Sequence, residues 1–213
     1  MTGTARKGWC PGAFRPMPSG DGLILRIRPR GGRLDAARVQ ALCEAAAIYG
    51  DGALELTNRA NVQLRGVRPE THAALLETLA SARLLDDDEA AEARRNILVA
   101  PLWHDGDDAP ALAAALEARL DELPDLPAKF GFAVDAGAAP MLTEASADIR
   151  IERASDGGLI VRADGSPAGR RVTAADAVDR TLELARWFRA NGGADAGRMA
   201  RLLRSTPLPA DWA

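Results

Sequence analysis

The chain has 213 residues, of which 47% are apolar and 27% charged, and its formal net charge at pH 7 is -3. A chain of this length buries roughly 70% of the surface that its unfolded form exposes, which is enough for one large domain or two small ones. The negative net charge argues against a general nucleic-acid-binding surface, and we find no apolar run long enough to span a bilayer and no signal peptide. We therefore expect a cytoplasmic protein with neither a nucleic-acid nor a membrane partner.

The first twenty residues are rich in proline and glycine, which predicts an extended arm outside any helix or sheet. Cys10 lies in this arm between an aromatic residue and a proline. Packing, a metal contact and a reactive thiol all remain open for Cys10. Packing is favoured because no neighbouring residue supplies the other ligands that a metal ion needs.

The segment 22–29 alternates as a strand does, so its side chains divide between two faces. One face is expected to hold Leu23, Leu25 and Ile27, and the other Ile24, Arg26 and Arg28. Two arginines on one face repel each other unless an anion or acidic side chains neutralise them, and a guanidinium fits a carboxylate bidentately. The face is therefore either the solvated side of an antiparallel sheet or an anion site.

A turn at Gly31 and Gly32 leads to Asp35, which is suited to capping a helix that reaches about Tyr49. The predicted buried stripe of this helix consists of Val39, Leu42, Cys43 and Ala46. Cys43 is accordingly expected to be a small core residue.

Two short strands are predicted at 53–56 and 61–64, joined by a tight turn. If Val62 and Leu64 face a core, Asn61, Gln63 and Arg65 face the other way, and this amide and guanidinium face suits a ligand that carries carboxylates. Pro69 then opens a second helix, with an apolar face of Leu75, Leu76 and Leu79. The order strand, helix, strand, strand, helix predicts one compact α+β half-domain.

Beyond the acidic run 86–89, the pattern predicts a second α+β domain. Strands are expected at 96–100 and 130–135, and a hairpin at 147–152 and 158–162. One helix should begin at Pro110 and bury leucines 112, 116, 120 and 123. Another, capped by Thr173 and Asp176, should run through Phe188 and bury Val178, Leu182 and Ala185. The predicted division is an arm (1–20), a half-domain (21–84), an acidic linker (85–94), a second domain (95–204) and a loose tail (205–213).

The two histidines, His72 and His104, give no metal site. His104 precedes several aspartates, but their spacing lacks the closing glutamate of a calcium loop, so a solvated turn is favoured. We predict no metal ligands in this chain.

Several segments carry a resemblance to a known family. They are Gly8-Trp9-Cys10-Pro11, 17–23, Ile24-Leu25-Arg26-Ile27-Arg28 with Gly31-Gly32, Ile48-Tyr49-Gly50, the run 56–66, Arg95-Asn96-Ile97-Leu98 and Leu126-Pro127-Ala128-Lys129-Phe130. In this order they resemble the sulfite and nitrite reductase superfamily, which uses sirohaem and a 4Fe-4S cluster, and most closely its precorrin-3B synthase branch. The resemblance runs from about residue 8 to at least residue 151.

The resemblance implies a ferredoxin-like half-domain and an oxidoreductase, a precorrin-3B synthase-like monooxygenase of aerobic cobalamin biosynthesis. It aligns Arg26, Arg95 and Lys129 with basic residues around the substrate anion of the reductases, which makes all three candidate catalytic residues. We expect Arg95 and Lys129 to face the reacting edge and Arg26 to pair with an acidic arm of the ligand. Residues expected to bind the acidic arms of the tetrapyrrole, a precorrin or sirohaem, are Arg28, Thr57, Asn58, Arg59, Asn61, Gln63 and Arg65.

Three departures from the family matter. Glu55 and Gly131 replace basic residues of the reductases, which argues against sulfite or nitrite reduction. The resemblance implies two tandem copies and four cluster cysteines, whereas this chain has one copy and two cysteines without a ligand motif. A second copy, in a homodimer, or another polypeptide is therefore expected as partner. The alternatives are a non-catalytic tetrapyrrole-binding module or a fragment of a sirohaem reductase.

Overall fold

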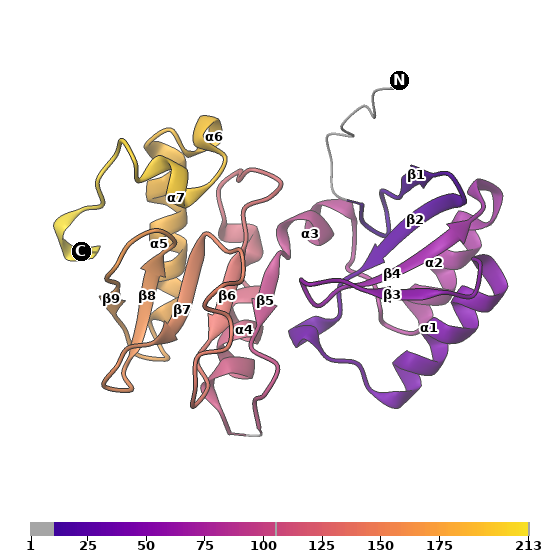
Figure 1. Ribbon diagram of the computed structural model, residues 1–213, viewed down its shortest axis with the longest axis horizontal. Helices are drawn as coiled ribbons and strands as arrows, with labels where there is room; N and C mark the ends of the chain where they lie inside the picture. The colour runs from indigo at the N-terminus through magenta and orange to yellow at the C-terminus, as the bar shows by residue number, and fades with distance from the viewer. Residues whose placement is uncertain (1–10, 105, 213) are drawn as a thin grey trace. The chain divides into compact units, whose positions relative to one another are not determined.

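The structure, a computed structural model, describes residues 11–104 and 106–212. Contacts divide them into two compact units. Unit 1 holds residues 11–28, 35–57 and 61–92, and unit 2 holds residues 29–34, 58–60 and 93–212. The two short segments 29–34 and 58–60 therefore group with unit 2, although the chain on both sides of them belongs to unit 1. Figure 1 labels the helices and strands of each unit.

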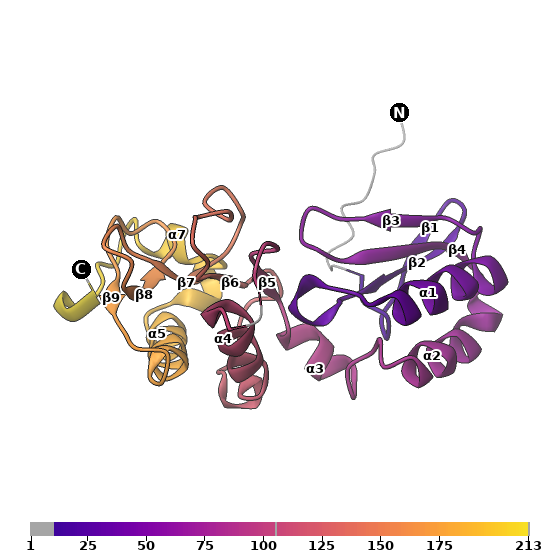
Figure 2. The same cartoon turned by 90° about the horizontal axis from the view of Figure 1, so that it is seen from below.

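Unit 1 is built on a four-stranded antiparallel sheet with the strand order β1-β2-β4-β3. Its strands are β1 (Met17–Ser19), β2 (Gly22–Ile27), β3 (Leu54–Leu56) and β4 (Val62–Val67). Its helices are α1 (Ala36–Tyr49), the 3₁₀ turn η2 (Pro69–Thr71) and α2 (His72–Ser81). Figure 2 shows α1 and α2 on the same face of the sheet. The predicted order of strand, helix, strand, strand and helix is confirmed.

The core of unit 1 forms between that face of the sheet and the two helices. Its buried side chains include Leu25, Ile27, Leu42, Val62, Leu64, Val67, Leu75 and Leu79. Alternation correctly assigns most of the strand residues to the core. Ile24 is an exception, because it is also buried, and the pairing of β2 with β4 shifts register between Leu23 and Leu25. Such a bulge breaks strict alternation of the two faces.

Helix α1 begins as predicted, with the Asp35 carboxylate accepting a hydrogen bond from the backbone N–H of Arg38 at 2.8 Å. Its buried residues are Leu42, Ala45 and Ala46. The predictions for Val39 and Cys43 were wrong, since Val39 is 43% exposed and Cys43 is also exposed. The helix is rich in alanine on every side, so its sequence defines the buried stripe only weakly.

The predicted arm is wrong at its end, because Met17–Ser19 form strand β1 and pair antiparallel with β2. Cys10 lies outside the described residues.

The prediction of an acidic linker is also wrong in part, because Glu89–Arg94 form helix α3, whose Glu92 is only 4% exposed. The Glu92 carboxylate accepts hydrogen bonds from the backbone N–H groups of Ala13 and Phe14 at 2.7 and 3.4 Å. These bonds tie the segment before β1 to α3.

Unit 2 is built on a mixed sheet with the strand order β5-β6-β7-β8-β9. Its strands are β5 (Ile97–Val99), β6 (Phe132–Asp135), β7 (Ile149–Arg153), β8 (Leu159–Ala163) and β9 (Arg170–Arg171). The first three strands are parallel and the last three antiparallel. The predicted hairpin is β7 and β8.

Unit 2 also contains several helices and 3₁₀ turns. They are η1 (Arg30–Gly32), α4 (Asp108–Glu117), η3 (Leu120–Glu122), α5 (Ala177–Ala190), α6 (Gly193–Ala196), α7 (Met199–Leu202) and η4 (Ala210–Trp212). Figure 2 shows α4 and α5 on one face of the sheet. The predicted stripe of α5 is confirmed, because Val178, Leu182 and Ala185 are all buried.

The main core of unit 2 lies between the sheet and helices α4 and α5, and it includes Phe130, Phe132, Leu116 and Phe188. The predicted loose tail is wrong, since Trp212 is 3% exposed and belongs to this core. The Arg170 guanidinium also lies 5.4 Å from the centre of the Trp212 ring. A tail that carries a single buried aromatic side chain has no periodicity by which its packing could be predicted.

Candidate functional site

A row of polar side chains crosses the face of the unit 1 sheet that points away from α1 and α2. Arg26 of β2, Gln63 of β4 and Glu55 of β3 occupy directly paired positions. Arg26 donates from Nη2 to Gln63 Oε1 at 2.8 Å, and Gln63 donates from Nε2 to Glu55 Oε2 at 2.9 Å. The Gln63 amide is therefore fixed in one orientation, with its oxygen toward the arginine.

Arg65 lies two residues along β4 on the same face and is paired with acids of unit 1. Its Nε donates to Asp21 at 3.0 Å, and its Nη1 lies 3.4 Å from Glu55. The hydrogen bond from Arg65 is the main cause that holds the pKa of Asp21 below its ordinary 3.8, and the same bond raises the pKa of Arg65. The positive charge of Arg65 is thus compensated by carboxylates of its own unit.

Arg26 differs from Arg65 in having a neutral partner. Within residues 11–104 and 106–212, its side chain forms a hydrogen bond with the Gln63 amide and no ion pair with a carboxylate. Its Nε is buried and has no hydrogen-bond acceptor there. A half-buried guanidinium whose charge is uncompensated is a binding group for an anion.

The turn between β3 and β4 is closed by its own first and last residues. Thr57 donates its backbone N–H to the Asn61 carbonyl at 2.9 Å, and Thr57 Oγ1 accepts from the Asn61 N–H at 3.1 Å. Inside the turn, Ala60 has a left-handed backbone conformation, with φ of 52°. Asn58 is exposed. The turn is therefore a rigid support that leaves the Asn58 side chain available to a ligand.

Two of the predicted arginines bind backbone carbonyls of their own unit. In unit 1, Arg28 donates to the Glu92 carbonyl at 2.6 Å. In unit 2, Arg59 donates to the Ser146 carbonyl and, at 2.9 Å, to the Asn96 side-chain oxygen. These bonds give both arginines a structural role that the sequence did not predict.

Arg95 and Lys129 belong to unit 2 and have opposite environments. Arg95 is 6% exposed, and its Nη1 lies 3.9 Å from Glu117, which also pairs with Arg30 at 3.0 Å. Lys129 is exposed in the turn that precedes β6. The structure therefore brings Arg26, Gln63 and Arg65 together on one face of unit 1, and it places Arg95 and Lys129 in the other unit.

The two acids of this site, Asp21 and Glu55, are hardly recognisable from the sequence alone. Glu55 is predicted only as a lost positive charge, and Asp21 is not predicted as a site residue. Both acids become recognisable once the strand register pairs Glu55 with Gln63 and brings Asp21 within reach of Arg65. Among residues 11–104 and 106–212, no group of three or more His, Cys, Asp or Glu side chains is arranged to hold a metal ion.

Comparison with known proteins relates this geometry to a family. Residues 15–82 match the model of the nitrite/sulfite reductase ferredoxin-like half domain. Residues 15–82 have the fold that this model describes. Over 165 residues the chain is 32% identical to a precorrin-3B synthase of Sinorhizobium sp, and over 95 residues it is 33% identical to a ferredoxin–nitrite reductase of Leptolyngbya laminosa. These findings support the resemblance to the precorrin-3B synthase branch of the sulfite and nitrite reductase superfamily.

A solved structure extends the similarity of fold. The chain matches the Mycobacterium tuberculosis NirA protein with a TM-score of 0.68 over 85% of its length, at 19% identity. The α+β fold of a half-domain followed by a second α+β region is thereby confirmed. The chain covers 33% of the precorrin-3B synthase, 18% of the nitrite reductase and 37% of NirA. It therefore spans between 18% and 37% of the length of these relatives.

One departure from the reductase pattern has a local structural reason. A Cβ atom at Gly131 would lie 2.7 Å from Asn96 Nδ2 and 2.9 Å from Arg59 Nη2. Asn96 in turn donates to the Phe130 carbonyl at 2.7 Å. The absence of a side chain at position 131 is thus what allows Arg59 and Asn96 to meet beside β6.

No helix in the described part of the chain is long and apolar enough to cross a membrane.

Proposed function

We propose that this chain is a precorrin-3B synthase-like protein that binds a carboxylate-rich tetrapyrrole for oxidative modification. The observation that carries the proposal is Arg26, whose charge has no carboxylate partner in the described chain and whose Nε is buried without an acceptor. A carboxylate arm of the tetrapyrrole would supply both the negative charge and the hydrogen-bond acceptor that Arg26 lacks. The identity to a precorrin-3B synthase supports this choice of ligand.

The residues near Arg26 are proposed to contribute to ligand binding in different ways. Gln63 orients Arg26, and the exposed Asn58 donates to a second arm from the closed turn of Thr57 and Asn61. Arg65 is already paired with Asp21, so it contributes by exchanging partners rather than as a free cation. Arg28 and Arg59 act mainly by holding backbone in place.

Arg95 and Lys129 are proposed to act on the reacting edge of the ligand. Lys129 is exposed and can approach an anion directly, whereas Arg95 is buried and partly compensated by Glu117. We therefore assign the direct contact to Lys129 and a supporting electrostatic role to Arg95.

The iron-sulfur cluster that the superfamily implies does not fit this chain alone. A four-iron cluster is commonly held by four thiolates, and the chain has two cysteines, at positions 10 and 43. We therefore propose that a second copy of the chain or another polypeptide completes the enzyme. The cysteine count also favours a second candidate function, a module that binds the tetrapyrrole without converting it.

Absorbance spectroscopy with iron and sulfide analysis distinguishes the two candidates. The full chain is purified anaerobically and measured before and after addition of uroporphyrin, a tetrapyrrole whose arms are all acetates and propionates. Saturable binding together with bound iron and sulfide supports the enzyme. Saturable binding without iron supports the non-catalytic module, and the absence of any saturable shift contradicts both candidates.

A further inference from the structure

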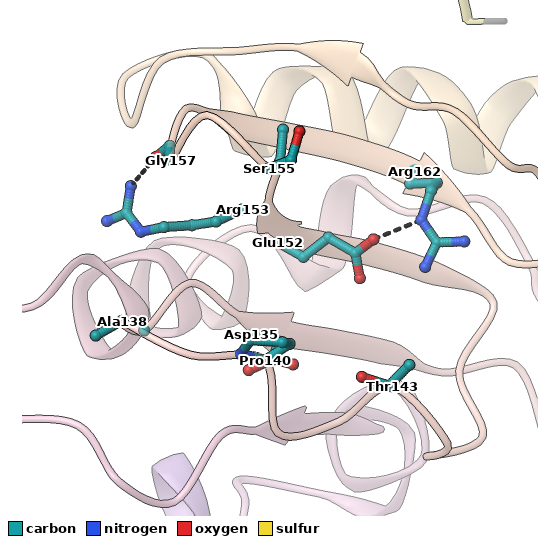
Figure 3. A pocket seen from close by; sticks show the side chains of 11 residues that line it. Asp135, Ala138, Pro140, Thr143, Glu152, Arg153, Ser155, Gly157 and Arg162 are labelled. Carbon is teal, nitrogen blue, oxygen red and sulfur yellow. Dashed lines mark hydrogen bonds and ion pairs between the residues drawn. The ribbon is translucent and has the colours of Figure 1, made fainter.

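Unit 2 contains a cavity of about 490 Å³ that the proposed tetrapyrrole site does not use. Its lining includes Asp135 of β6, Glu152 and Arg153 of β7, Arg162 of β8, and Thr143 (Figure 3). Within β6, Val134 belongs to the core under α4 and α5. Asp135 follows Val134, so its side chain lies on the opposite face of the sheet.

Asp135 is the feature of this cavity that most needs an explanation. The residue is 5% exposed, and its Oδ2 accepts hydrogen bonds from the N–H groups of Met141 and Leu142, both at 2.8 Å. Its Oδ1 is buried and has no partner within residues 11–104 and 106–212. A buried carboxylate oxygen without a hydrogen bond is costly, so a missing partner is expected at this point.

Glu152 adds a second carboxylate beside Asp135. The two residues occupy directly paired positions of the parallel strands β6 and β7. Glu152 Oε1 accepts from Arg162 Nε, as the dashed line in Figure 3 shows, while its second oxygen has no protein partner in the described chain. Two acceptor oxygens therefore remain for a ligand.

The arginines of the lining do not compensate Asp135. Arg153 donates to the Ala136 and Gly157 carbonyls at 3.0 and 2.8 Å, and to Asp108 at 2.6 Å. The lining holds two carboxylates and two guanidinium groups. Arg162 pairs with Glu152, and Arg153 pairs with Asp108, which lies outside the lining, so Asp135 has no cationic partner within residues 11–104 and 106–212.

We propose that this cavity binds a small organic cation through an ammonium or guanidinium group. The cation donates to Asp135 Oδ1 and to the second oxygen of Glu152, and the Thr143 hydroxyl provides a further polar contact. The volume lies within the range of roughly 300 to 1,000 Å³ that is usual for small-molecule sites. With only two carboxylates and no third acidic or imidazole ligand among the described residues, the cavity suits an organic cation better than a metal ion.

Isothermal titration of the full chain tests this proposal with agmatine and spermidine as cationic probes. Butanediol serves as the uncharged counterpart, and magnesium chloride as the metal. We expect saturable binding of at least one of the two cations and none of butanediol. Binding of magnesium chloride in place of either cation, or no binding of the cations at millimolar concentration, would overturn the proposal.

Three variants place the binding in the cavity. Asp135→Asn and Glu152→Gln should each weaken binding by about tenfold or more, because each removes a charge-assisted hydrogen bond. Glu144→Gln is the matched control, since it removes the same charge from an exposed residue next to Thr143 that does not line the cavity. Equal affinity in all three variants would overturn the assignment. Glu152→Gln leaves the Asp135 bonds to the loop intact, so it decides the question if Asp135→Asn does not fold.

Discussion

Arg26 and Gln63 face each other across β2 and β4, and the arginine donates to the amide oxygen at 2.8 Å. The other end of the same amide donates to Glu55 at 2.9 Å. The cation and the acid are thus separated by a neutral group that has been given a fixed orientation. This separation keeps the charge of Arg26 available, whereas the charge of Arg65 on the same face is paired with Asp21.

Replacing Gln63 by glutamate should abolish that separation. In Gln63→Glu the new carboxylate pairs with Arg26 and repels Glu55, so we expect weaker uroporphyrin binding than in Gln63→Ala. Gln63→Ala removes only the amide that orients the Arg26 guanidinium. In Gln63→Glu the added carboxylate also competes with the ligand for that guanidinium. Fluorescence titration of both variants measures the difference. Tighter binding by Gln63→Glu than by Gln63→Ala would contradict the role given to the free charge.

Glu92 should make the stability of unit 1 depend on pH. Burial raises the pKa of Glu92 above its ordinary 4.5, although its hydrogen bonds from Ala13 and Phe14 oppose the shift. The folded state therefore binds the proton more tightly than the unfolded chain does. The contribution is complete below pH 4.5 and is lost as the pH rises through the higher folded pKa.

Glu92→Gln removes this titration. We expect the stability of the wild type relative to Glu92→Gln to fall as the pH rises from 4.5 through the folded pKa, as measured by urea unfolding at a series of pH values. Glu89→Gln, at an exposed position of the same helix, should retain the wild-type dependence. An unchanged pH dependence in Glu92→Gln would show that Glu92 is not its source.

Gly131→Ala should destabilise unit 2, because its Cβ would collide with Asn96 and Arg59. The expected loss is about 1 to 3 kcal/mol, the usual cost of overpacking. Gly137→Ala is the control, since a Cβ there meets nothing within 4 Å. Urea unfolding compares the two variants with the wild type. Equal stability of both variants would contradict the close approach at position 131.

Trp212→Ala should also destabilise unit 2, because a buried aromatic ring is removed from the main core. The expected loss is about 3 to 5 kcal/mol, as for other large-to-small substitutions of aromatic residues. Thermal unfolding followed by near-ultraviolet circular dichroism measures it. A melting temperature equal to that of the wild type would mean that the tail contributes nothing to the fold.

The sequence predicted those parts of the fold that depend on neighbouring residues. The cap at Asp35 and the buried stripe of Val178, Leu182 and Ala185 follow from local spacing, and the structure confirms both. Cys43 was predicted to be buried and is exposed, whereas the tail was predicted to be loose and its Trp212 is buried. Both predictions were wrong because the exposure of these residues depends on how distant segments pack. Glu92 was missed for the same reason, since its partners lie nearly 80 positions earlier in the chain, at Ala13 and Phe14.

In the candidate site, too, the features that depend on residues far apart in the chain could not be predicted from the sequence. Alternation correctly placed Gln63 and Arg65 opposite Val62 and Leu64. It could not show that Glu55 is the residue paired with Gln63, because strand register is set by tertiary structure. Asp135 was missed as well: its unpartnered oxygen becomes evident only when the hydrogen bonds of the loop after β6 are known.

A uroporphyrin titration of Arg26→Gln is the most direct test of whether Arg26 binds a carboxylate arm of a tetrapyrrole. Loss of a charge-assisted hydrogen bond worth about 1.5 to 3 kcal/mol predicts a dissociation constant about 10 to 150 times that of the wild type. Arg38→Gln removes the same charge from α1, on the opposite face of the unit 1 sheet, and should bind as the wild type does. Equal affinity of Arg26→Gln and Arg38→Gln would show that Arg26 does not bind the ligand.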